Sequence, residues 1–279
     1  MTKIDKIVLS VKKCLKSVYN KKYYFKALGR KSIIKNGSIL ILIQDMERMG
    51  SEVLALNIAK EFSGQGIDFC VISYDVGPLY ADFVSTGPVI ICPERKMKRI
   101  AMILSSKYEC HKILCNTVVC GDSTAIFKAC GYRVISLIHE LKQSIINNNF
   151  QEKCVEIAKS ADSIVFPSRY GYVDFCSIIK DRSIDGKCLI RPQGLYLTKD
   201  FQYDSEICNE VRKRYSIPFG KKIVINVATA NKRKGIDLFL KVAQEAKNVD
   251  DNIIFVWVDR KSTRLNSSHR LTSRMPSSA

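Results

Sequence analysis

Hydrophobic and polar residues alternate in blocks along residues 37–258. Ile39–Ile43 is an unbroken run of Ile and Leu, which predicts a strand buried on both faces of a parallel sheet. Beyond Gly50 the apolar residues recur at helical spacing, so we expect a helix with Ser51 as its N-cap and Gly64 at its end. The chain therefore begins its ordered pattern with a strand–helix unit.

The same alternation continues as far as residue 196. Strands are expected at 67–73, 89–92, 112–115, 133–138, 163–166 and 188–190, and helices at 97–104, 125–130 and 152–160. Strands that alternate with helices are typical of a parallel sheet covered on both faces. We therefore predict a complete α/β, Rossmann-like domain over residues 37–196.

A polar segment over 197–219, with a helix near 206–215, is interpreted as an interdomain connection. The apolar pattern then restarts at 220–258, with a strand at 222–228, a helix at 234–243 and a strand at 252–258. This predicts the start of a second Rossmann-like domain.

The net charge of +18 is concentrated at the two ends of the chain. Residues 1–36 hold 11 Lys and Arg against one Asp, residues 260–279 hold five and no acid, and the 223 residues between them carry only +3. A nucleic-acid-binding protein would place its basic residues on the folded domain. This distribution argues against nucleic acid as a partner.

Residues 1–36 have the pattern of a basic amphipathic helix, with apolar residues at helical spacing among lysines. Such a segment suits an anionic membrane surface, and it equally suits a helix that packs its apolar stripe on the domain.

Residues 259–279 have a different character, since they are rich in Ser and Arg and lack periodicity. The run from Asp259 to His269 is also what one frame of a common sequencing adapter encodes. We expect a non-native tail here, the alternative being a natural disordered basic tail. The second domain would then be truncated after two strands, leaving an exposed apolar edge and poor solubility.

The composition indicates a globular cytoplasmic protein. No apolar run approaches the roughly 18 residues that a membrane span requires, and the lysine-rich N-terminus offers no secretory signal. The 11 cysteines form no close CxxC pair, so we expect reduced core cysteines and no metal site.

Motifs of metalloproteases, α/β-hydrolases and P-loop proteins are absent from the sequence. Candidate site residues instead follow strand ends, where ligands bind in such folds: His139, Asn116 and Ser168. His139 is the candidate catalytic residue, although a strand-terminal His also serves to cap a carbonyl. Gly50 would let a phosphate approach the N–H groups at a helix start, or would simply form a turn.

A cationic run, Lys232-Arg233-Lys234-Gly235, opens the predicted second-domain helix. Cations there oppose the helix dipole, so a bound diphosphate would stabilise them. The alternative is that these cationic side chains bind no anion and simply point into solvent.

The order of five stretches resembles the GT-B glycosyltransferases of family four, a retaining, nucleotide-sugar-dependent group. The stretches, which span residues 37–258, are Gly50-Ser51-Glu52, Ile138-His139-Glu140, 161–168, Arg191-Pro192-Gln193-Gly194 and 233–239. The resemblance implies a GT-B fold of two facing Rossmann-like domains that bind acceptor and donor.

Carried over from this family, Gly50 would lie near the donor phosphates, His139 would contact the donor sugar, and Lys234 would bind the diphosphate. Arg233 is a substitute for the family's diphosphate-clamping Arg, whose usual place is taken by Ala228 and Thr229. We add Thr229 to the donor site, and assign Asn116 and Ser168 to the acceptor site.

The resemblance implies a glycosyltransferase of hexosyltransferase type that uses a UDP- or GDP-linked sugar without a cofactor. A saccharide or lipid-linked acceptor of bacterial surface-polysaccharide or glycolipid synthesis would lie at the inner face of the membrane. The family's paired glutamates have no counterpart here, so we expect this chain alone to be inactive or nearly so.

A non-catalytic module or another nucleotide-binding Rossmann-like protein, such as a reductase, is the alternative. Against the reductase, the first strand–helix loop has only Gly50 in place of a Gly-x-Gly-x-x-Gly motif.

Overall fold

The computed structural model describes residues 34–181, 184–194 and 204–259. The chain divides into two compact units, Met1–Leu197 and Thr198–Ala279, and each is described by itself. The amphipathic helix predicted within residues 1–36 and the tail predicted from 259 onward lie almost entirely outside the described residues.

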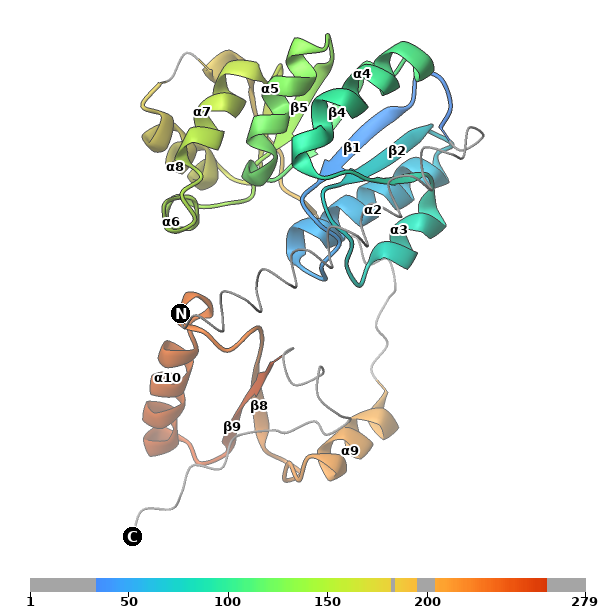
Figure 1. The fold of residues 1–279 in the computed structure, drawn as a ribbon. Helices are drawn as coiled ribbons and strands as arrows, with labels where there is room; N and C mark the ends of the chain where they lie inside the picture. The colour runs from blue at the N-terminus through green and yellow to red at the C-terminus, as the bar shows by residue number, and fades with distance from the viewer. Residues whose placement is uncertain (1–33, 182–183, 195–203, 260–279) are drawn as a thin grey trace, which may run out of the picture. The chain divides into compact units, whose positions relative to one another are not determined.

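The first unit contains a parallel sheet with the strand order β3-β2-β1-β4-β5-β6-β7 (Figure 1). Its strands are β1 (Ile39–Ile43), β2 (Phe69–Ser73), β3 (Val89–Ile91), β4 (Lys112–Asn116), β5 (Arg133–Leu137), β6 (Ser163–Phe166) and β7 (Cys188–Ile190). The order reverses direction between β1 and β4, which pair in parallel. In open α/β sheets, the carboxyl ends of two such strands form the crevice in which ligands bind.

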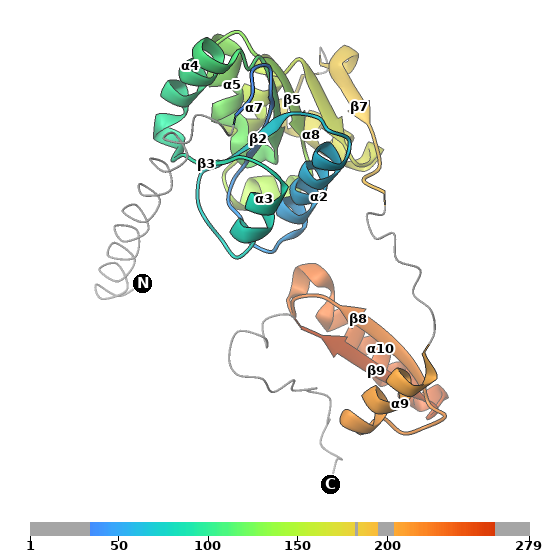
Figure 2. The ribbon, with the colours of Figure 1, turned by 90° about the vertical axis from the view of Figure 1, so that its right-hand side faces the viewer.

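Helices cover both faces of this sheet (Figures 1 and 2). They are α2 (Gly50–Gly64), α3 (Tyr80–Thr86), α4 (Met97–Tyr108), α5 (Gly121–Ala129), α6 (Lys142–Asn147), α7 (Gln151–Ser160) and α8 (Arg169–Ile179). In β1, Leu40 and Leu42 belong to the core beneath α4 and α5, whereas Ile41 and Ile43 belong to the core beneath α2 and α3. Burial on both faces explains the unbroken apolar run, as predicted.

Most predicted elements of the first unit are present, and their limits differ in places. The helix after β1 has Met49 as its N-cap, so the prediction of Ser51 was wrong; Ser51 lies inside the first turn. Helix α5 begins at Gly121, four residues before the predicted start, and α3, α6 and α8 were not predicted.

The second unit contains α9 (Ser205–Arg214), β8 (Lys222–Val227), α10 (Ile236–Val249) and β9 (Ile253–Val258). β8 and β9 pair in parallel, with α9 and α10 on opposite sides of them in Figure 1. The ring of Phe239 packs edge-on against those of Phe255 and Trp257, each at 5.3 Å. Apolar side chains of β8 remain exposed, among them Ile225 at 59% and Val227 at 70%.

None of the ten cysteines in the described ranges forms a disulfide, and seven of them are buried. Their surroundings are apolar, and burial raises the pKa of the Cys115 thiol to about 12. Within the same ranges there is no group of ligating side chains that could hold a metal ion. None of the helices described there is long and apolar enough to cross a bilayer.

Candidate functional site

A side-chain hydrogen bond joins the end of β4 to the first turn of α2. The Asn116 Nδ2 atom donates to the backbone carbonyl of Ser51, in the first turn of α2, at 3.0 Å. Asn116 is fully buried. Because its nitrogen is bound to a carbonyl, its Oδ1 atom is left as an acceptor for a neighbouring side chain.

That neighbour is His139, which follows β5. Its Nε2 atom lies 2.9 Å from Asn116 Oδ1, and its Nδ1 atom lies 2.8 Å from Nε2 of Gln193, which follows β7. Since Asn116 Oδ1 accepts, His139 Nε2 carries the ring proton and Nδ1 accepts from Gln193. Burial lowers the pKa of His139 to about 4, so the imidazole is neutral at pH 7.

Two carboxylates lie beside this cluster. Glu140 Oε2 accepts from the backbone N–H groups of His139 and Val118, at 3.1 and 3.2 Å. Glu52, in the first turn of α2, is only 3% exposed and accepts from Ser51 Oγ at 2.8 Å. Burial raises the pKa of both carboxyls, and repulsion from Asp45 and Glu140 adds to the rise for Glu52.

Thr117, directly after β4, has a backbone conformation of φ 78° and ψ 157°. This region is otherwise occupied almost only by glycine, and a β-branched residue pays a conformational energy there. The conformation is held by the Thr117 N–H, which donates to Leu137 O at 2.9 Å, and by Thr117 Oγ1, which accepts from the Val119 N–H. Strain is thus concentrated next to Asn116, at the same strand end.

Gly50 and Ser168, predicted to contact donor and acceptor, lie at helix starts in the first unit. Gly50 is the first residue of α2, and a Cβ atom built on it would meet no atom within 4 Å. Ser168 is the N-cap of α8, where its hydroxyl accepts from the Gly171 N–H at 3.2 Å. These positions do not show whether either residue contacts a ligand. The donor role of Gly50 and the acceptor role of Ser168 therefore remain predictions, as does the acceptor role of the buried Asn116.

In the second unit, the predicted donor residues Thr229, Arg233 and Lys234 follow β8. Lys232–Lys234 forms a single 3₁₀ turn, and Gly235 then takes a left-handed conformation with φ 77°. Helix α10 starts at Ile236, so the prediction that it starts at Lys234 was wrong. The cations therefore occupy an exposed turn before the helix.

The side chain of Asn231 organises this turn, since its Oδ1 accepts from the Lys234 N–H at 3.0 Å. Among the described residues, Arg233 and Lys234 take part in no salt bridge. The carboxylate of Asp259 accepts from the Ala230 N–H at 3.2 Å. The turn is thus a compact, positively charged surface.

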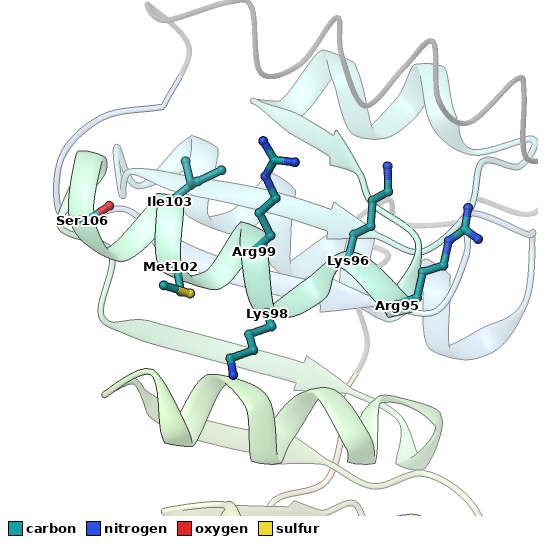
Figure 3. A pocket seen from close by; sticks show the side chains of 7 residues that line it. All are labelled: Arg95, Lys96, Lys98, Arg99, Met102, Ile103 and Ser106. Carbon is teal, nitrogen blue, oxygen red and sulfur yellow. The ribbon is translucent and has the colours of Figure 1, made fainter.

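A second basic surface, which the sequence did not predict, runs along α4 and the turn before it. It forms an open groove of about 650 Å³ lined by Arg95, Lys96, Lys98, Arg99, Met102, Ile103 and Ser106. Figure 3 shows Lys96 and Arg99 on one side of the helix and Lys98 on the other. Met102 is 56% exposed among these cations. Residues 37–259 carry a net charge of only +3, so the total charge of this segment did not indicate the local cluster of cations on α4.

The sequence predicted His139 and Asn116 as site residues, and the structure brings these two side chains together, but the sequence assigned no role to Gln193, Glu140 or Glu52. The stretch containing Gln193 was noted only as part of a motif. Glu52 has an ordinary place for an acid in the first turn of a helix, so nothing local indicated that it is buried.

The fold matches those of solved glycosyltransferases of the GT-B type. HepE of Anabaena, crystallised with UDP and glucose, aligns with a TM-score of 0.64 and 13% identity over 80% of this chain and 61% of its own. A glycosyltransferase from Rickettsia africae aligns with a TM-score of 0.54 and 13% identity, over 81% of this chain and 69% of its own.

This chain thus spans about 61% of the length of HepE as crystallised with UDP and glucose. No protein-family model and no curated protein sequence matches the chain. The likeness is one of structure, and it defines the chain as an α/β protein with the GT-B type of fold.

Proposed function

We propose that this chain is part of a nucleotide-sugar-dependent glycosyltransferase of family four, of the retaining, hexosyltransferase type. The observation that carries the proposal is the neutral His139, held at the carboxyl ends of the strands in a GT-B type of sheet. HepE was crystallised with UDP-glucose, which favours a UDP-linked donor over a GDP-linked one.

In the proposed reaction, the bond between the sugar and the donor diphosphate breaks, and an acceptor hydroxyl forms the new glycosidic bond and passes its proton to the departing diphosphate. Lys234 and Arg233 stabilise the charge that develops on the departing diphosphate, with Thr229 near its oxygens. These side chains supply the positive charge that a metal ion would otherwise supply, and no cofactor takes part.

The proposed acceptor is a saccharide or a lipid-linked saccharide of bacterial surface-polysaccharide or glycolipid synthesis, contacted by residues near Asn116 and Ser168. A cytoplasmic enzyme at the inner face of the membrane would meet such an acceptor. The cationic α4 groove supports this placement, because Arg and Lys around an exposed Met suit an anionic bilayer surface.

The chain's single tryptophan offers a direct test of donor binding. Trp257 Nε1 donates to the carbonyl of Ala228 at 2.8 Å, and Ala228 directly precedes Thr229. Binding of UDP or GDP at the Thr229–Lys234 loop should therefore change the fluorescence of Trp257.

We expect Lys234→Ala to weaken this binding by about tenfold or more, since a charge-assisted hydrogen bond contributes about 1.5–3 kcal/mol. Lys247→Ala, an equal loss of charge in the last turn of α10, serves as the matched control and should leave binding unchanged. A folded chain whose Trp257 emission responds to neither nucleotide would refute the donor site. Binding without sugar transfer is expected of this chain alone, because its described second unit has no pair of glutamates like that of the family.

A further inference from the structure

Gln193 completes a chain of side-chain hydrogen bonds that joins three strand ends to the start of α2. Its Nε2 atom donates to His139 Nδ1 at 2.8 Å, His139 Nε2 donates to Asn116 Oδ1 at 2.9 Å, and Asn116 Nδ2 donates to Ser51 O at 3.0 Å. The direction of each bond follows from the last one, because a backbone carbonyl can only accept.

The two ends of this chain differ in accessibility. Asn116 is fully buried, so its contact with His139 is shielded from solvent, whereas Gln193 is exposed. A ligand can therefore replace Gln193 at Nδ1, but it cannot reach the Nε2 side of the ring without displacing Asn116. The position next to Nδ1 suits a group that donates a hydrogen bond, such as a sugar hydroxyl.

We propose that Gln193 is a positioning residue, which together with Asn116 fixes His139 in the Nε2–H tautomer and keeps Nδ1 as an acceptor. His139 then serves the ligand as a neutral hydrogen-bond acceptor, and Gln193 fills that place until a ligand hydroxyl takes it. The nature of the ligand rests on the proposed function, whereas the tautomer and its cause do not.

The charged groups next to His139 are compatible with a neutral ring in the Nε2–H tautomer. Glu140 accepts from the backbone N–H of His139, so its carboxylate is engaged with the main chain and not with the ring. The side-chain carboxyl group of Glu52 accepts a hydrogen bond from Ser51 Oγ. Both ring nitrogens face amide groups, which leave the ring uncharged.

The test uses the full chain labelled with ¹⁵N at histidine, in which only three residues give signals: His111, His139 and His269. Long-range ¹⁵N–¹H spectra distinguish a protonated from an unprotonated ring nitrogen, and a His139→Gln variant assigns the resonances. At pH 7 without ligand we expect His139 to show Nε2 protonated and Nδ1 unprotonated.

Gln193→Glu replaces the donor at Nδ1 by a carboxylate, which favours protonation of Nδ1. We expect the proton affinity of His139 to rise about tenfold or more, since an opposite charge within hydrogen-bonding distance commonly has an effect of this size. Gln193→Leu, of similar size and without charge, should leave it within about threefold of wild type. Gln143→Glu on α6, where Gln143 Nε2 donates to Asn147 Oδ1, makes the same chemical change elsewhere and should leave His139 unchanged.

Three results would overturn the proposal: an Nδ1–H tautomer, a charged ring at pH 7 in the wild type, or equal proton affinities in Gln193→Glu and Gln193→Leu. None of them depends on donor binding, which the fluorescence of Trp257 measures. A failure of this inference is therefore distinct from a failure of the proposed function.

Discussion

Two glycines at helix starts allow a ligand requirement to be separated from a packing requirement. Gly50 opens α2 and Gly121 opens α5. We consider alanine at each position, because the same added methyl group meets open space in one case and a neighbouring helix in the other. Gly50→Ala should leave the fold intact, and Gly121→Ala should destabilise it.

The magnitude for Gly121→Ala follows from its contact with α7. A Cβ atom at residue 121 would lie 2.6 Å from the backbone oxygen of Lys153 and 2.9 Å from its Cα. Backbone atoms cannot rotate away, so α5 and α7 must separate. Overpacking of this kind costs about 1–3 kcal/mol. Against this, the better helix propensity of alanine returns at most about 1 kcal/mol. Because these contacts with backbone atoms are so short, the upper end of that range applies, and the net loss of about 2 kcal/mol corresponds to a Tm lower by about 4–8 °C in a unit of this size.

Gly50→Ala meets no atom within 4 Å and has no left-handed backbone angle, so its Tm should equal or slightly exceed that of the wild type. If the start of α2 receives a phosphate, the added methyl should nevertheless weaken the binding of UDP by the same chain, measured by isothermal titration. Thermal unfolding followed by circular dichroism measures both variants side by side. Equal Tm values for Gly50→Ala and Gly121→Ala would refute the packing argument, and an unchanged UDP affinity of Gly50→Ala would refute the proposed phosphate contact.

Two further outcomes concern the α4 surface and the pH dependence of stability. Arg95→Glu with Arg99→Glu should reduce co-sedimentation with vesicles that contain anionic lipid, relative to the same double reversal on α10 at Lys241 and Lys247. Equal losses, or binding to RNA that falls in parallel, would contradict a specific membrane surface. Burial alone would raise the pKa of Asp162, but Lys128 and the Val134 N–H outweigh it and hold that pKa below its usual value. Its stabilisation is therefore present above the unfolded pKa of about 3.9 and is lost as the pH falls through the folded pKa. Asp162→Asn should weaken the acid dependence of the urea midpoint between about pH 5 and 2, and an unchanged slope would contradict this role.

The sequence by itself determined the strand–helix order and much of the core. β1 was predicted with its observed limits, because five successive apolar residues leave no polar face and require burial on both sides. The same local signal failed for α3 and α6, which are short, and for α8, whose N-cap Ser168 was assigned only to the acceptor site. Helix limits were also missed where backbone geometry decides them, as at Gly235 before α10.

The tertiary structure alone decided which polar groups meet. Ser51, Asn116, His139 and Gln193 come from four separate parts of the chain, and only the reversal of strand order between β1 and β4 brings them to one edge of the sheet. The tautomer and neutrality of His139, and the burial of Glu52, depend on these distant neighbours. The periodicity of a segment indicates which of its faces is buried. Hydrogen bonds across the sheet depend instead on strand order, which the spacing of residues along the chain does not determine.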